Sequence, residues 1–106
     1  MTYVFDIDGT ICTKTDGDYS LAMPIQPRID KINQLHEEGH KIIFLTARGM
    51  GRSDNSSAYA HGAFYDLTRQ QLLAWGVKFH SLFLGKPAGD FYIDDKGIND
   101  EQFFGN

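Results

Sequence analysis

Residues 3–10 read Tyr3-Val4-Phe5-Asp6-Ile7-Asp8-Gly9-Thr10, an apolar run that ends in two carboxylates, a glycine and a threonine. The run predicts a buried strand over residues 3–8. Alternation along that strand places Asp6 and Asp8 on one side at its C-terminal end, where open α/β sheets bind ligands. Two carboxylates this close repel each other, so they need a cation or a shared proton. A divalent metal with a carboxylate nucleophile is the use that this spacing favours.

The rest of the chain alternates between helical and strand patterns. Helices are expected from Pro27 to Gly39, over residues 64–75 and over residues 98–104. Strands are expected at residues 41–47, at 77–79 or 82–84, and at 91–94. Polar loops are expected over residues 9–26 and 48–62. Strands that alternate with helices indicate a small, doubly wound, Rossmann-like parallel α/β sheet. A chain of 106 residues suits one domain, residues 1–106.

Composition narrows the classes of function. Hydrophobic residues make up 42% of the chain and aromatic residues 13%, which is enough for a packed core. The net charge of −4 and the lack of a basic run argue against nucleic acid as a partner. There is no apolar stretch long enough for a bilayer, no signal-peptide pattern, and one cysteine, Cys12, which is expected to serve packing. We therefore expect a cytoplasmic protein without a membrane partner.

Polar residues also follow the later apolar runs. Thr46 closes Phe44-Leu45-Thr46-Ala47, and its hydroxyl beside the Ala47 amide would suit a phosphate oxygen, although a turn or cap is the ordinary role of such a threonine. Lys86 follows Leu84-Gly85, and it is either a surface lysine or a fixed charge at the site. Tyr92-Ile93-Asp94-Asp95 ends in adjacent acids, whose oxygens suit Mg²⁺.

These four segments, in this order, resemble the signatures of the haloacid dehalogenase (HAD) superfamily of aspartyl-phosphate phosphatases. The resemblance implies that Asp6 is the nucleophile and Asp8 the general acid/base. It also implies that Thr46, Ala47 and Lys86 bind the substrate phosphate, and that the metal Mg²⁺ is held by Asp6, Asp8, Asp94 and Asp95. Asp94 is the expected direct ligand, and Asp95 the ligand that acts through water.

The chain departs from the family pattern in two places. Only residues 86–90 separate the third and fourth signatures, whereas a parallel crossover takes a dozen or more residues. Neither the interval after the first strand nor the interval before the fourth has room for a cap domain. The chain therefore resembles the capless phosphatases, whose open site a neighbouring subunit can cover. Selection of substrate is then expected from the two loops, with Arg48 and Arg52 as candidates.

Short capless sequences of this kind resemble phosphatases of bacterial surface-polysaccharide pathways, so a sugar or polyol phosphate is the expected substrate by analogy. Two readings from other classes stay open. A receiver-like signalling domain would need a carboxylate at the end of the second strand, where Thr46 stands. A phosphate-binding regulatory module without catalysis would have the fold without the activity.

Overall fold

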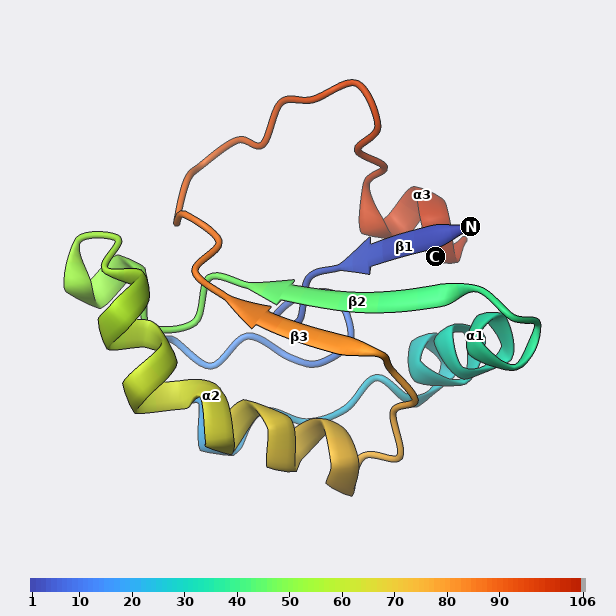
Figure 1. Cartoon of the computed structure of the whole chain (residues 1–106), viewed down its shortest axis with the longest axis horizontal. Coiled ribbons are helices and arrows are strands. Elements are labelled where there is room, and N and C mark those ends of the chain that lie inside the picture. Colours follow the sequence, from blue (N-terminus) through green and yellow to red (C-terminus); the bar gives the residue numbers. More distant parts are fainter. Residues whose placement is uncertain (106) are drawn as a thin grey trace.

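Three parallel strands form the framework of the computed structural model, which describes residues 1–105. They are β1 (Thr2–Phe5), β2 (Lys41–Thr46) and β3 (Ser81–Leu84). The spatial order is β1-β2-β3, and the register pairs Phe5 with Phe44 and Thr46 with Leu84. All three strands end on the same side (Figure 1), so the residues that follow them meet at one edge. The predicted Rossmann-like α/β class, with an open parallel sheet and no cap domain, is confirmed.

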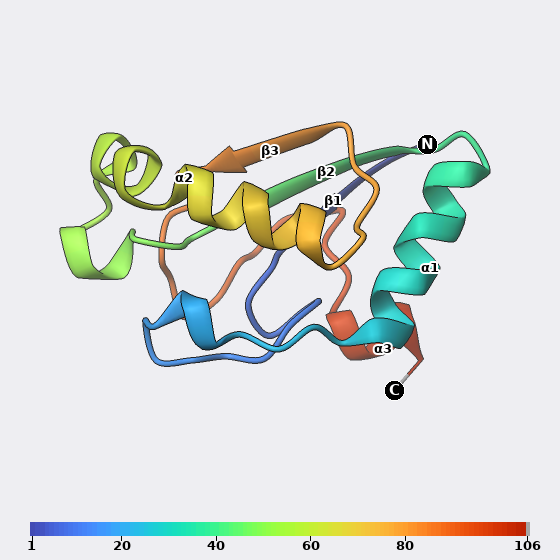
Figure 2. The ribbon, with the colours of Figure 1, turned by 90° about the horizontal axis from the view of Figure 1, so that it is seen from below.

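Two longer helices make the crossovers between the strands. Helix α1 (Gln26–Glu37) has Pro27 in its first turn, and α2 (Ser57–Ala74) begins where the Ser56 hydroxyl accepts a hydrogen bond from the Tyr59 amide. The loop expected over residues 48–62 is therefore shorter than predicted, because this cap starts α2 at Ser57. Both helices lie on the same face of the sheet (Figure 2). This follows because the strands are arranged in chain order and both crossovers have the same hand.

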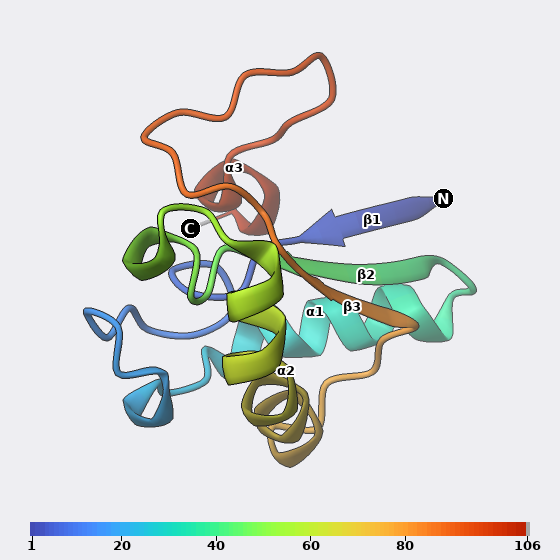
Figure 3. The same ribbon diagram turned by 60° about the vertical axis from the view of Figure 1, so that its left-hand side comes forward.

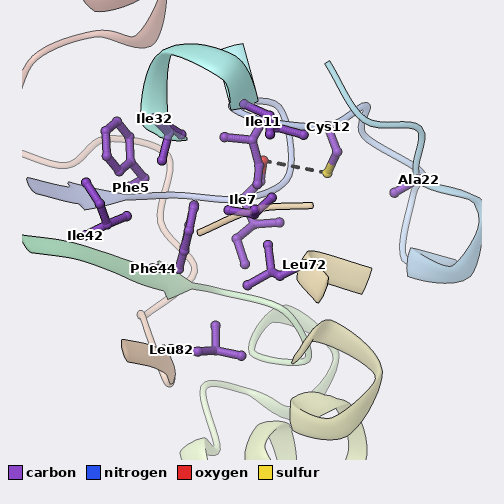
Figure 4. Packing of buried hydrophobic residues seen from close by; sticks show 12 residues of the cluster. Phe5, Ile7, Ile11, Cys12, Ala22, Ile32, Ile42, Phe44, Leu72 and Leu82 are labelled. Atoms are coloured by element: carbon purple, nitrogen blue, oxygen red, sulfur yellow. Dashed lines mark hydrogen bonds between the residues drawn. The ribbon is translucent and has the colours of Figure 1, made fainter. Parts of the chain in front are cut away.

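Burial alternates along the strands and identifies the inner face. Phe5, Phe44 and Leu82 point toward the helices and are buried together with Ile32 of α1 and Leu72 of α2 (Figure 4). The alternate residues Val4 and Phe83 are 57% and 54% exposed. Residues 1–105 thus cover one face of the sheet with helices and leave much of the other face open (Figure 2). The doubly wound arrangement predicted from the sequence, with helices on both faces, is therefore corrected for this part of the chain, because both crossovers of a sheet in the order β1-β2-β3 run over the same face.

The C-terminal segment corrects one predicted element. Residues 91–94 are not a strand; residues 85–99 carry no helix or strand, and the short helix α3 (Asp100–Phe104) follows them beside β1. Figure 3 shows this segment leaving the end of β3 and arching over to the β1 side. The physical reason is length, because the few residues after β3 cannot make the crossover that a further parallel strand needs. Phe91 and Ile93 consequently stand 85% and 94% exposed.

Two one-turn 3₁₀ helices complete the elements: η1 (Tyr19–Leu21) and η2 (Gly51–Ser53). The first lies in the segment between β1 and α1, residues 9–25, which we call the flap. Among the helices of residues 1–105, none is both long and apolar enough to cross a membrane.

Candidate active site

Asp6 and Lys86 meet at the C-terminal edge of the sheet. Asp6 follows β1, and its Oδ1 accepts a hydrogen bond of 2.8 Å from the Ile7 amide. Its Oδ2 lies 3.7 Å from the Lys86 ammonium. Lys86 follows β3 after Gly85, whose φ of +104° turns the chain, and the Lys86 amide donates to the Thr46 carbonyl. Lys86 thus reaches Asp6 directly from the strand end, without a crossover helix.

The surroundings of Asp6 disfavour its charged form. Burial of the carboxyl is the largest influence and raises its pKa above the ordinary value of 3.8. The hydrogen bond from the Ile7 amide and the charge of Lys86 act in the opposite direction, and the neighbouring Asp8 carboxylate raises the pKa further. Asp6 is therefore a partly buried carboxylate, with 36% of its side chain exposed and one cation beside it, which is a suitable environment for a nucleophile.

Asp8 is held by Arg48. The guanidinium donates from Nε to Asp8 Oδ2 at 2.8 Å and from Nη2 to Oδ1 at 2.9 Å, a two-pronged pair. Arg48 was a candidate for substrate selection in the polar loop expected over residues 48–62; only 2% of the residue is exposed, so it does not lie in a solvated loop, and its part in selection stays a prediction. The physical reason is the turn after β2, where Thr46 Oγ1 accepts a hydrogen bond from the Arg48 amide. This turn directs the Arg48 side chain into the buried side of the sheet.

Arg52 also contacts the protein itself. It donates to the Gly17 carbonyl in the flap, and its guanidinium lies 5.3 Å from the ring centre of Tyr19 and 4.7 Å from that of Phe64. Arg52 therefore fastens the flap to the start of α2. Local sequence patterns could not predict this contact, because it joins three segments that are far apart along the chain.

Thr46 and Ala47 lie where predicted, at the end of β2 and between the ends of β1 and β3. Thr46 is buried, and its hydroxyl oxygen accepts the Arg48 amide at 3.1 Å. Ala47 is half-buried. The ordinary turn role of a strand-end threonine is thus present, and a role of Thr46 and Ala47 in phosphate binding stays a prediction.

Asp94 and Asp95 are not gathered with Asp6 and Asp8. Both are exposed on the C-terminal segment, and Asp94 Oδ1 accepts hydrogen bonds of 2.6 Å from the amides of Lys96 and Gly97. Within residues 1–105 there is no cluster of three or more His, Cys, Asp or Glu residues that could hold a metal. The expected four-residue Mg²⁺ set is therefore not assembled in this arrangement. Arg48 engages both oxygens of the Asp8 side chain, so Asp6 is the carboxylate after β1 that Arg48 does not hold.

Cys12 is buried behind the site and was expected to serve packing. Its sulfur lies 3.5 Å from Asp8 Oδ1. Burial, with the Asp8 charge as the next influence, raises its pKa to about 12. The thiol is therefore neutral at physiological pH and is a poor nucleophile, which fits a packing role.

Comparison with known proteins concerns the fold alone. No family model matches the sequence, and no curated protein matches it at a significant level. A protein from Vibrio cholerae known by its crystal structure superposes with a TM-score of 0.89 at 24% identity, over 97% of this chain and 86% of that one. A chain of the Pnkp1/Rnl/Hen1 complex superposes with a TM-score of 0.61 at 17% identity, over 88% of this chain and 30% of its own length.

A third structure is the D,D-heptose 1.7-bisphosphate phosphatase from B. bronchiseptica, complexed with magnesium and phosphate. Its TM-score is 0.55 at 17% identity, over 84% of this chain and 51% of that one. The chain therefore shares its α/β fold with proteins that include a phosphatase.

Proposed function

We propose that this chain is a HAD-type phosphomonoester hydrolase that forms an aspartyl-phosphate on Asp6 and requires Mg²⁺. The observation that carries the proposal is the meeting of Asp6 and Lys86 at 3.7 Å, with Asp8 two residues away, at the edge where three parallel strands end. The fold that the chain shares with a magnesium- and phosphate-bound phosphatase gives independent support.

The chemistry assigned to these residues has two steps. In the first, an Asp6 oxygen attacks phosphorus, the bond from phosphorus to the substrate oxygen breaks, and the protonated form of Asp8 gives its proton to the departing alcohol and becomes a carboxylate. In the second, water attacks the phosphorus, Asp8 takes its proton, and Asp6 is released as a carboxylate. Lys86 and the amides near Ile7 and Ala47 bind the phosphoryl oxygens, whose charge Lys86 offsets.

Mg²⁺, when bound, supplies positive charge that reduces repulsion between the anionic nucleophile and the phosphate. Asp6 and the Asp8 carbonyl would hold it, because Mg²⁺ is commonly bound by one or two carboxylates together with waters and substrate oxygens. Asp94 and Asp95 complete the proposed set only if the C-terminal segment reaches the edge.

The proposed substrate is a small sugar or polyol phosphate, supported by the open site without a cap and by the resemblance to polysaccharide-pathway phosphatases. The net charge of −4 favours such a substrate over nucleic acid. A cytoplasmic location follows from the nature of that substrate. A second copy of the chain is the proposed cover of the site.

The test is hydrolysis of p-nitrophenyl phosphate and of a panel of sugar phosphates by the purified protein, with Mg²⁺ and with EDTA. Asp6→Asn is expected to lower kcat by at least about 1,000-fold, because the covalent route is lost. Asp66→Asn, the same change at an exposed position of α2, is the control and should retain activity. Near-normal turnover by Asp6→Asn would sink the assignment.

The metal set is tested separately through Asp94. Asp94→Ala is expected to raise the Mg²⁺ concentration for half-maximal rate by about tenfold or more, with Asp95→Ala showing a smaller effect. If both variants keep the wild-type Mg²⁺ dependence, the C-terminal segment supplies no ligand and the metal rests on Asp6 and Asp8.

A further inference from the structure

Arg48 is the buried cation of the site, and it touches Asp8 rather than the open edge where a substrate would lie. We propose that Arg48 is a positioning residue that fixes the Asp8 carboxylate for hydrolysis of the aspartyl-phosphate. This inference rests on the proposed function and goes beyond it, because it assigns to Arg48 a role that is exercised through Asp8.

The geometry restrains both oxygens of Asp8. Arg48 Nε binds Oδ2 and Nη2 binds Oδ1, so the carboxylate plane is fixed and cannot rotate without breaking a charge-assisted hydrogen bond. A lysine could not reproduce this restraint, because its ammonium is a single point charge. The Asp8 side chain is 22% exposed, so Arg48 does not close it off from solvent.

Arg48 is itself held in place. Its Nη1 donates to Thr68 Oγ1 at 3.2 Å and to Gln71 Oε1 at 2.5 Å, both on α2, and its guanidinium lies 4.8 Å from the ring centre of Tyr19. The orientation of Asp8 therefore depends on α2, which holds the Arg48 guanidinium through Thr68 and Gln71. Two segments of the fold, α2 and the flap, meet on this one guanidinium.

Burial separates this role from phosphate binding. The Arg48 side chain is 0% exposed, so it cannot reach a phosphoryl oxygen at the open edge. Asp8 is the one acidic side chain with which Arg48 forms a salt bridge among the described pairs. A charge buried in this way would be costly without that partner, so the pair must be kept together for the fold as well as for the chemistry.

The test separates the two chemical steps. With p-nitrophenyl phosphate the leaving group needs no proton, so Arg48→Met should release the first equivalent of nitrophenolate within about threefold of the wild-type rate. Later turnovers need Asp8 to take a proton from water, and they should be about 100-fold slower. Arg48→Lys should behave like Arg48→Met although it keeps the positive charge, because lysine cannot make the two parallel hydrogen bonds that the guanidinium makes to Asp8.

Arg52→Met is the matched control, since Arg52 lies over the same Tyr19 ring and has no described contact with Asp8. It should change the first release and the later turnovers by the same factor. Thr68→Val, which keeps the shape and removes one hydrogen bond to Arg48, covers the case in which Arg48→Met fails to fold; it should slow the later turnovers alone, by a smaller factor.

A second readout needs no activity. In a double-mutant cycle on the metal-free protein, Asp8→Asn and Arg48→Met should be coupled by about tenfold or more in the unfolding equilibrium constant. Additive effects of the two substitutions on unfolding would refute the energetic coupling of Asp8 and Arg48. Equal slowing of both steps in Arg48→Met would refute the positioning role. Wild-type turnover in Arg48→Lys would show that the two parallel hydrogen bonds are not needed. A wild-type protein that hydrolyses no phosphomonoester would refute the proposed function, and with it the role given to Asp8.

Discussion

Replacing Phe44 by alanine tests which face of the sheet forms the core on which the site is built. Phe44 lies in the central strand β2, is fully buried, and packs with ring centres 6.0 Å from Phe5 and 5.9 Å from Phe79. Removing a buried phenylalanine side chain costs about 3–5 kcal/mol of unfolding free energy. For a domain of this size each kcal/mol lowers Tm by roughly 4–8 °C, so a fall of at least about 12 °C is expected.

Phe83→Ala is the matched comparison, because the same side chain is removed from the neighbouring strand on the opposite face. Phe83 is 54% exposed, so the cost should be about 1 kcal/mol or less. Urea denaturation followed by circular dichroism measures both variants against the wild type. If Phe83→Ala costs as much as Phe44→Ala at every protein concentration, the face that carries Phe83 is covered in the folded chain and the alternation described here is refuted.

Two further predictions concern the site. Burial raises the pKa of Asp6, so the folded protein binds this proton more tightly than the unfolded chain does, and stability falls as pH rises from the ordinary value of 3.8 through the folded value. Asp6→Asn should therefore raise Tm at pH 7 by about 1–3 °C, and the effect is modest because the side chain is partly exposed. The same variant should not raise Tm at pH 3. A lower Tm of Asp6→Asn at pH 7 would contradict this account. Lys86→Met should lower kcat for p-nitrophenyl phosphate by about 100-fold, because the positive charge near Asp6 is lost. Lys78→Met, which removes a lysine from an exposed ion pair with Glu37, is the control and should leave kcat unchanged. A loss of less than threefold in Lys86→Met would show that Lys86 has no part in the reaction.

Much of the frame could be predicted from local pattern. The apolar runs before Asp6 and Thr46 become β1 and β2, although helices cover only one face of the sheet and Val4 stays 57% exposed. The polar residues that follow them share one edge, because parallel strands end on the same side. Lys86 joins them for the same reason, although it follows a short strand.

The run at residues 91–94 has the same local pattern and is not a strand. Pattern alone cannot distinguish an apolar run that pairs from one that does not, because pairing depends on whether the preceding connection can reach an open edge. The short interval after Lys86 was visible in the sequence and was the better guide.

Arg48 could not be placed from sequence, because its direction is decided by partners on other segments. In sequence it stands in a polar stretch with Arg52, and nothing local separates the two. Thr68 and Gln71, twenty or more residues later, receive its guanidinium and fix it against Asp8. Arg52 finds a flap carbonyl instead and remains exposed.

The two carboxylates after β1 thereby acquire different surroundings although they are only two residues apart. Asp6 is partly buried, lies 3.7 Å from the Lys86 ammonium, and keeps one oxygen free of any described backbone hydrogen bond. Asp8 has both oxygens engaged by a buried guanidinium. A nucleophile needs an oxygen that can approach phosphorus, whereas an acid/base group needs a fixed direction toward the proton that it transfers. Neighbouring carboxylates in contrasting environments are how acid/base roles are divided in other enzymes. Under the proposed function, the division here would follow from the cation that each carboxylate meets, Lys86 for Asp6 and Arg48 for Asp8.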